Sequence, residues 1–215
     1  AVLHTCQWLE QNGFEVTYLD VDENGVVKLE ELKKAIRPDT ILITIMFANN
    51  EIGTIEPVAE IGKIAREHDI LFHTDAVQAF GQVPINVDEL NIDMLSTSAH
   101  KLNGPKGIGF LYIREGVKIH SFIHGGAQER KRRAGTENVP GIIGMAKAAQ
   151  MAADDMEERT ARECKLRDYM IERILKEIPY ARLNGDAVKR LPGNANFSFQ
   201  FVEGESLLIM LDMDG

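Results

Sequence analysis

The sequence predicts an α/β fold with a mainly parallel sheet, and three observations support this prediction. Apolar runs rich in β-branched residues alternate with stretches of helical periodicity over residues 1–113. One run, TILITIMFA at 40–48, is apolar at both odd and even positions, which is typical of a strand buried inside a parallel sheet. Polar residues follow several of these runs where each strand should end. In open parallel sheets, functional groups gather at that carboxyl edge.

The individual elements follow from local signals along the chain. Up to the buried strand we expect a helix that Gly13 stops, a strand, a turn, a helix that Pro38 closes, and the buried strand itself, at 1–13, 14–21, 22–25, 28–37 and 40–48. After it we expect a loop, a helix and three further strands, at 49–57, 58–69, 70–77, 93–100 and 107–113. This order is that of repeated βα units.

The pattern changes near Pro140. Residues 141–178 read as nearly continuous helix, much longer than the mean of about 12 residues, and such helices often connect two domains. The strand expected at 194–201 and a following helix predict the start of a smaller α+β domain. We therefore expect a large domain over 1–150 without its amino-terminal part, and an interdomain helix with an incomplete second domain over 151–215. The chain reads as a central piece of a longer protein.

Composition excludes several classes of function. The net charge of -9 disfavours nucleic-acid binding, because a phosphate backbone would be repelled. No apolar run approaches the ~20 residues that span a bilayer, so no membrane partner is expected. The two cysteines, Cys6 and Cys164, are too few for a disulfide framework, and the histidines lack metal-ligand spacing, so we expect no metal and a cytoplasmic setting.

Polar side chains cluster at three predicted strand ends. They are Asn49 and Asn50 after the first strand, His73, Asp75 and Gln78 at the second, and Ser96, Ser98, His100 and Lys101 at the third. A single aspartate at a strand end is usually a helix cap or an ion-pair partner. Three adjacent ends that direct polar groups into one crevice are better explained by a binding site.

These residue types fit pyridoxal phosphate (PLP). A partly desolvated amine such as Lys101 is nucleophilic and can bond to an aldehyde. An aspartate such as Asp75 suits a protonated pyridine nitrogen, and Ser98 and His100 could bind a phosphate. From the residues alone, a plain phosphate or nucleotide site remains an equal alternative.

Two other positions compete for a role. Lys106 lies in the turn GPKGIG, where the simplest interpretation is a solvated charge, whereas Lys101 directly follows a strand. Thr136, in RAGTEN ahead of the long helix, could cap that helix and offer its hydroxyl to an anion.

Five blocks in order resemble the PLP-dependent cysteine desulfurases of the NifS/IscS branch, and the resemblance covers essentially the whole chain. They are NNEIG (49–53), HTDAVQAFGQ (73–82), STSAHKLNGPKGIGFLYIR (96–114), HGGAQERKRRAGTENVPGIIGM (124–145) and SFQFVEGESLLIMLD (198–212). The resemblance implies an aspartate-aminotransferase-like large domain (PLP fold type I) with a smaller C-terminal domain. It also implies a homodimer.

The resemblance further implies a role for each matching residue. Lys101, not Lys106, would carry the cofactor covalently, and Asp75 would pair with its pyridine nitrogen. Gln78 and Asn50 would contact its phenolic oxygen, and Asn50 would also contact the substrate carboxylate.

The phosphate contacts are implied in the same way. Ser98 and His100 would bind the phosphate, and Thr136 would reach the cofactor of the neighbouring subunit. Lys101 and His100 are the catalytic residues expected.

The implied reaction removes sulfur from L-cysteine, giving L-alanine and an enzyme persulfide whose sulfur passes to iron–sulfur scaffolds or other acceptor proteins. The family's ring-stacking histidine would precede Ala1, and its nucleophilic cysteine and substrate-binding arginine would follow Gly215. Neither Cys6 nor Cys164 occupies the nucleophile's place, so this piece alone is expected to be inactive. A related PLP enzyme (an aminotransferase or selenocysteine lyase) and a truncated, non-catalytic dimerisation module remain alternatives.

Overall fold

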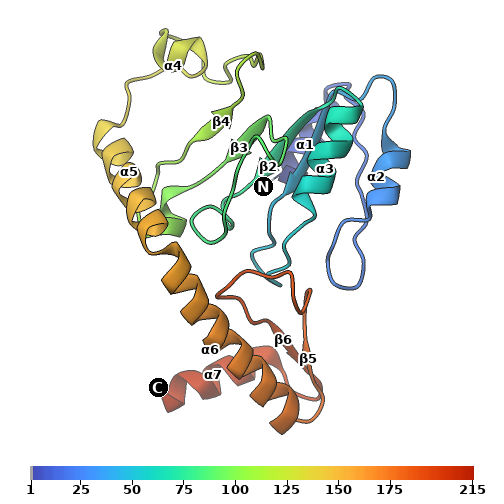
Figure 1. Ribbon diagram of the computed structural model, residues 1–215, viewed down its shortest axis with the longest axis vertical. Coiled ribbons are helices and arrows are strands. Elements are labelled where there is room, and N and C mark those ends of the chain that lie inside the picture. The colour runs from blue at the N-terminus through green and yellow to red at the C-terminus, as the bar shows by residue number, and fades with distance from the viewer. Residues whose placement is uncertain (1) are drawn as a thin grey trace.

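The computed structural model describes residues 2–215, and a four-stranded sheet forms its centre (Figure 1). The strands lie in the order β1-β2-β3-β4. They span Leu42–Met46, Leu71–Asp75, Met94–Ser96 and Leu111–Ile113. β1, β2 and β3 are parallel, and β4 is antiparallel to β3. The predicted α/β fold with a mainly parallel sheet is therefore confirmed.

One face of this sheet is covered by α3 (Val58–Glu67), and the main core lies between them. Phe72 of β2 and Ile61 of α3 are fully buried there. Gly62 allows the helix to approach the Leu90 carbonyl so closely that any Cβ would overlap it. Because side chains alternate along a strand, Phe72 and Thr74 point into this core, whereas His73 and Asp75 point to the other face.

The remaining elements frame the sheet. In chain order they are α1 (Val2–Gln11), α2 (Leu29–Ala35), the 3-10 turn η1 (Ala99–Leu102), α4 (Gln128–Lys131), α5 (Val139–Asp154), α6 (Met156–Glu177), β5 (Ala181–Leu183), β6 (Phe197–Phe199) and α7 (Gly204–Asp214). β5 and β6 form an antiparallel pair beside α6. None of the helices between residues 2 and 215 is long and apolar enough to cross a membrane.

Two sequence predictions need correction. The strand expected at 14–21 is absent: the segment is irregular apart from an isolated bridge between Val21 and Val27. A strand requires a partner for its backbone groups, and no described strand pairs with this segment. The helix expected over 141–178 is divided at Asp155, whose φ of -104° and ψ of 2° depart from helical values.

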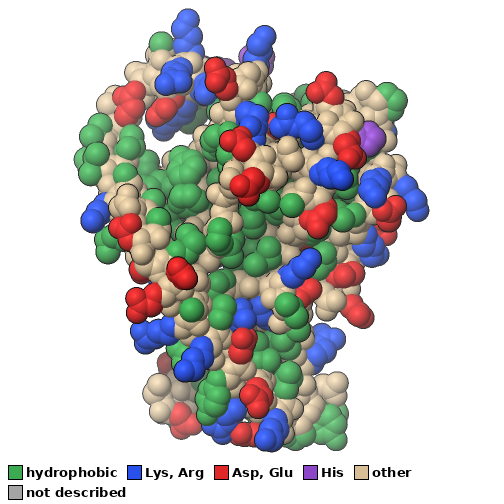
Figure 2. All heavy atoms as spheres, in the orientation of Figure 1, with side chains coloured by type: hydrophobic (Ala, Val, Ile, Leu, Met, Phe, Trp, Pro, Cys, Tyr) green, Lys and Arg blue, Asp and Glu red, His purple; other side chains and the backbone are tan. Residues whose placement is uncertain are grey.

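The strand predicted at 40–48 is shorter and less buried than expected. β1 lies at the edge of the sheet, and Ile41 and Leu42 are exposed. Apolar side chains also gather on the surface over α5 and β4 (Figure 2). Exposed apolar residues of these elements and their flanks include Phe110, Leu111, Ile142, Ile143 and Met151.

Candidate active site

The carboxyl ends of β1, β2 and β3 lie side by side, as the sequence predicted. Met46, Asp75 and Ser96 are register partners across the three strands, so the segments that follow them leave the same edge of the sheet. This edge carries Asn49 and Asn50 after β1, Asp75 and Gln78 at and after the end of β2 and, shortly after β3, the turn η1 with His100 and Lys101.

Asp75 is held at the end of β2 by its own turn. Its Oδ1 accepts a hydrogen bond from the Val77 N–H at 3.0 Å. Its carbonyl accepts one from the Phe47 N–H at 2.8 Å, and the Ala76 N–H donates to the Ser96 carbonyl at 3.0 Å. The backbone on both sides thus fixes a half-buried carboxylate at the edge of the sheet. Gln78, also half-buried, lies in the turn that follows.

His73 lies inside β2 rather than at its end, which corrects its grouping with the strand-end residues. Its Nδ1 is 2.7 Å from Thr44 Oγ1, and its Nε2 is 2.8 Å from Ser96 Oγ. These hydrogen bonds link three neighbouring strands on the face that carries Asp75. Burial lowers the pKa of His73, and the nearby Asp75 carboxylate opposes this only in part. A neutral imidazole matches both hydroxyls, because each can donate or accept.

This pKa shift predicts a pH dependence of stability. An unfolded chain protonates His73 near its ordinary pKa of about 6.5, whereas the native pKa is lower. The unfolded state therefore binds more protons in acid than the native state does. As a result, the contribution of His73 to the free energy of unfolding is complete above about pH 6.5 and declines as pH falls. One proton gives a slope of at most about 1.4 kcal/mol per pH unit. In urea titrations, the free energy of unfolding of His73→Gln should depend less steeply on pH below about pH 6.5 than that of the wild type, and an unchanged dependence would contradict this assignment.

The turn η1 presents Ser98, His100 and Lys101 together. Ser98 Oγ lies 2.7 Å from His100 Nδ1, which orients the imidazole. Leu102 is buried and anchors the turn against Gly81, where a Cβ would come within 2.6 Å of the leucine Cδ2. The side chains of His100 and Lys101 remain exposed. The turn therefore places an amine and a hydroxyl–imidazole pair at one end of the sheet.

A cavity of about 330 Å³ beside Lys101 is not the common site of the other predicted residues, because none of Asn50, Asp75, Gln78, Ser98 and His100 borders it. It lies between η1, α5 and α6, and Lys101 borders it, whereas Lys106 does not. Arg159 lines its far side and donates to Gln82 Oε1 at 3.2 Å and to Asp155 Oδ1 at 3.1 Å. Lys106 is an exposed residue of the following turn, in agreement with its interpretation as a solvated charge.

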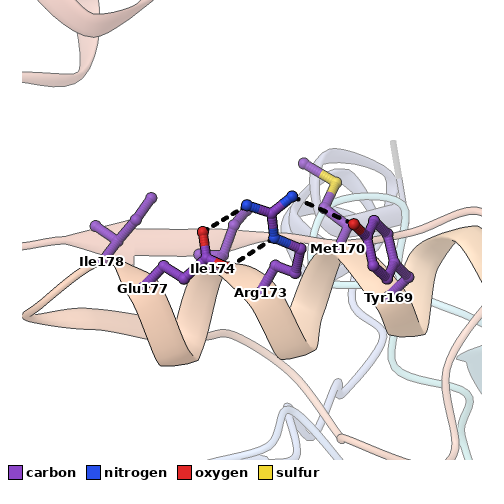
Figure 3. Close-up of a pocket in the computed structure, with 6 residues that line it drawn as sticks. All are labelled: Tyr169, Met170, Arg173, Ile174, Glu177 and Ile178. Atoms are coloured by element: carbon purple, nitrogen blue, oxygen red, sulfur yellow. Dashed lines mark hydrogen bonds and ion pairs between the residues drawn. The ribbon is translucent and has the colours of Figure 1, made fainter.

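A second hollow lies on the surface of α6 alone (Figure 3). Arg173 bridges it, donating to Glu177 at 2.6 and 2.7 Å and to the Tyr169 hydroxyl at 3.2 Å. These residues are one helical turn apart on an exposed face, so the contacts are those of a solvated helix surface. None of the strand-end residues contributes to this hollow.

Thr136 is not brought to the strand ends. The segment between α4 and α5, which carries it, stands away from the sheet (Figure 1), and its side chain is exposed. The suggestion that Thr136 caps the long helix is wrong: Asn138 accepts a hydrogen bond from the Gly141 N–H at 3.1 Å and caps α5 instead. Asn138 lies directly before the first residue of the helix, whereas Thr136 lies two residues too early.

The loop after β1 carries Asn50, which is exposed, and sequence reasoning missed what holds this loop. Asn49 Oδ1 accepts hydrogen bonds from the Glu51 and Ile52 N–H groups at 2.8 and 3.1 Å. The segment between β5 and β6 then packs on the loop through Arg190 and other residues. The stretch KRLPGNAN around Arg190 has the composition of a surface loop, so no local signal marked it.

Comparisons with known proteins identify the family of this chain. A family profile described as Aminotransferase class-V matches residues 1–215. The chain is 62% identical to a protein of Methanosarcina thermophila and 60% identical to one of Dictyoglomus turgidum, both named cysteine desulfurase IscS, over its whole length. It covers 53% and 55% of those two proteins, so it spans about half the length of the curated relatives it matches.

Solved structures give the same result. A structure described as a NifS-like protein matches all of this chain with a TM-score of 0.94 and 42% identity, and 59% of that protein is covered. A structure of SspA in complex with cysteine matches with a TM-score of 0.81 and 40% identity, over all of this chain and 58% of that one. These matches also agree with the PLP fold type I architecture expected from the resemblance. Because the family profile spans the entire sequence, the chain belongs to the class-V aminotransferase family.

Proposed function

We propose that this chain is the central part of a PLP-dependent cysteine desulfurase. The observation that carries the proposal is identity of about 60% over all 215 residues to proteins named cysteine desulfurase. The Asp75 carboxylate at the end of β2, and the Ser98–His100 pair followed by Lys101 after the neighbouring strand β3, support the proposal. The net reaction converts L-cysteine and a protein thiol into L-alanine and a protein persulfide, which balances every atom.

The residues present fit PLP by the chemistry of their side chains. The cofactor has an aldehyde, a ring nitrogen that is cationic when protonated, a phenolic oxygen and a phosphate. Lys101 offers an amine to the first, and Asp75 offers a fixed carboxylate to the second. Gln78 and Asn50 are amides suited to the phenolic oxygen. Ser98 and His100 form the donor pair suited to the phosphate.

The chain's own residues then have distinct tasks. When bound, PLP supplies an electron sink for the negative charge left on the substrate Cα. Lys101 would move the proton at that Cα as a general base and acid. Asp75 keeps the ring nitrogen protonated, and Asn50 holds the substrate carboxylate. The sulfur-accepting thiol is assigned to neither Cys6, on α1, nor Cys164, on α6, since neither occupies the place that the resemblance gives to the nucleophile.

The proposal includes the remaining expectations about the whole protein. We propose a homodimer in which the segment carrying Thr136 reaches the neighbouring subunit, and its exposure away from the sheet supports this. Residues 1–150 would belong to the PLP-binding domain and 151–215 to the interdomain helix and small domain. An iron–sulfur scaffold or another sulfur-acceptor protein would receive the persulfide sulfur, in the cytoplasm.

The test is the stoichiometry of products from the complete protein. With PLP, L-cysteine and a thiol reductant, we expect equal amounts of L-alanine and sulfide over many turnovers. Consumption of L-cysteine only when a keto acid is added, with that acid aminated, would identify an aminotransferase instead. Turnover of selenocysteine without turnover of cysteine would identify a selenocysteine lyase. Either result would refute the proposal.

A further inference from the structure

We infer that Arg190 and Asn194, which lie between β5 and β6, are positioning residues. They hold the Asn50 loop (residues 49–54) in the conformation in which Asn50 can contact the substrate. This inference rests on the proposed function, because it assigns Asn50 a contact with the substrate carboxylate. The two segments are far apart in the sequence and meet in space below the sheet (Figure 1).

Arg190 is the centre of this contact. Its side chain belongs to a residue only 3% exposed, and its guanidinium donates to the carbonyls of Asn194, Asp186 and Ile52 at 3.0, 3.1 and 3.1 Å. It also donates to Asn194 Oδ1 at 3.1 Å. The Ile52 carbonyl belongs to the Asn50 loop, and the other acceptors belong to the arginine's own segment. A planar guanidinium with donors in a fixed fork therefore sets the orientation of one segment on the other.

Asn194 supplies the second attachment. Its Nδ2 donates to the Glu51 carbonyl at 2.9 Å, directly after Asn50 in the chain. At Gly53 of the loop, φ is +78° and a Cβ would come within 2.5 Å of the Asn194 side chain, so the two segments are in close contact. Asn194 is thus bound at one end by Arg190 and at the other by the loop.

Backbone hydrogen bonds extend the same contact. The Leu191 N–H donates to the Gly53 carbonyl at 2.8 Å, and the Ile55 N–H donates to the Lys189 carbonyl at 2.9 Å. These bonds would hold the two segments together even with a smaller residue at 190. The arginine is therefore not required merely to join them.

The chemistry of Arg190 also indicates a geometric role. Among residues 2–215 it forms no ion pair, and all four of its hydrogen bonds go to neutral oxygens. Burial lowers the pKa of its guanidinium and nearby Arg167 acts in the same direction, whereas the Asp186 and Asp168 carboxylates oppose this shift. Placing a cation in such a site is costly, and an apolar residue would fill the space with less desolvation. What the arginine provides, and an apolar residue cannot, is directed attachment to the carbonyl of Ile52.

The experiment is a double-mutant cycle in the complete protein with PLP bound. Arg190→Gln and Asn194→Ala each remove part of the attachment, and Asn50→Ala removes the group that is positioned. Ser198→Ala is the matched control, since its hydroxyl bonds to Asn184 within the β5–β6 unit and not to the loop. For each variant, KM and kcat for L-cysteine, thermal unfolding and amide hydrogen exchange of residues 49–54 are measured.

We expect Asn194→Ala and Arg190→Gln to raise KM about 10-fold while kcat changes less than about 3-fold, and to speed amide exchange in the loop. In the Asn50→Ala background the KM effect should disappear, whereas any loss of thermal stability should persist. A KM effect of equal size in both backgrounds, or unchanged exchange in the loop, would overturn the inference. Asn194→Ala keeps the test usable if Arg190→Gln does not fold.

Failure of the proposed function is recognised separately. If the wild-type protein does not turn over L-cysteine, two other quantities are measured in the same variants. They are the amide hydrogen exchange of residues 49–54 and the absorbance of bound PLP, whose phenolic oxygen Asn50 would contact. Faster exchange with an absorbance change that disappears in Asn50→Ala would still support the positioning role. If neither the exchange nor the absorbance changes, the positioning role is refuted.

Discussion

Replacement of Lys101 by alanine is expected to abolish covalent attachment of PLP and to reduce turnover of L-cysteine by at least about 10³-fold. The lysine has two tasks in the proposed reaction, holding the aldehyde and moving the Cα proton, and positioned acid–base catalysis alone contributes about 10²–10⁴-fold. Its place in η1, directly after the Ser98–His100 pair, is the structural reason for the choice. Borohydride reduction followed by digestion and mass spectrometry reports the attachment site directly.

Lys106→Ala is the matched control for this prediction. Both lysines are exposed and lie five residues apart, but Lys106 is outside η1 and does not border the cavity. We expect the control to keep the pyridoxyl label on Lys101 and turnover within about 2-fold, as for an exposed surface substitution. A label that moves to Lys106, or that scatters over many lysines in the wild-type protein, would show that η1 does not form the attachment site.

The sheet and its polar carboxyl edge could be predicted from the sequence because local signals agree with the tertiary arrangement there. β1 and β2 are short, β-branched or apolar segments between clear helical and turn signals, and parallel pairing aligns their carboxyl ends. Topology then brings the ends of β2 and β3, with Asp75 and Ser96, to the same edge of the sheet. Polar residues at three strand ends thus pointed to one site without any knowledge of its contacts.

The segment 14–21 shows where this reasoning fails. Its alternating apolar residues predict a strand, but a strand depends on a partner that local sequence does not specify. Phe14, Tyr18 and Val21 are about half exposed in the structure, so these apolar side chains are not buried against a neighbouring element as those of a sheet strand would be. Strand register cannot be predicted from local sequence for the same reason. Predicting the Thr44–His73–Ser96 hydrogen bonds requires knowing which residues of the three strands lie side by side.

Arg190 illustrates a second limit. In sequence it is one of several charged residues in a glycine- and asparagine-rich stretch, where a solvated side chain is the usual interpretation. Its burial results from contact with a loop 138 residues earlier in the chain. Only the folded structure reveals such a non-local contact, and it is the contact from which the positioning role is inferred.

Asp75→Asn is expected to lower kcat for L-cysteine by about 10²–10⁴-fold while leaving the fold intact. The proposed role of the carboxylate is electrostatic, because its charge keeps the ring nitrogen of PLP protonated and so strengthens the electron sink. An asparagine has the same shape, and its Oδ1 can still accept the Val77 N–H bond that fixes the turn. At about 1.4 kcal/mol for each tenfold change, the loss corresponds to about 3–6 kcal/mol of transition-state stabilisation.

Asp22→Asn is a matched control, because Asp22 also accepts a hydrogen bond from the N–H two residues later, at 2.9 Å, in an exposed turn. Each variant loses one negative charge and keeps the hydrogen bond that fixes its turn. The two variants therefore differ in where the lost charge lay. We expect the control to keep kcat within about 2-fold and the thermal midpoint of both variants to stay close to wild type. With ¹⁵N-labelled PLP, the ring nitrogen should lose its proton in Asp75→Asn alone. A nitrogen that stays protonated in Asp75→Asn would mean that another group provides the charge, and the assignment of Asp75 would have to be abandoned.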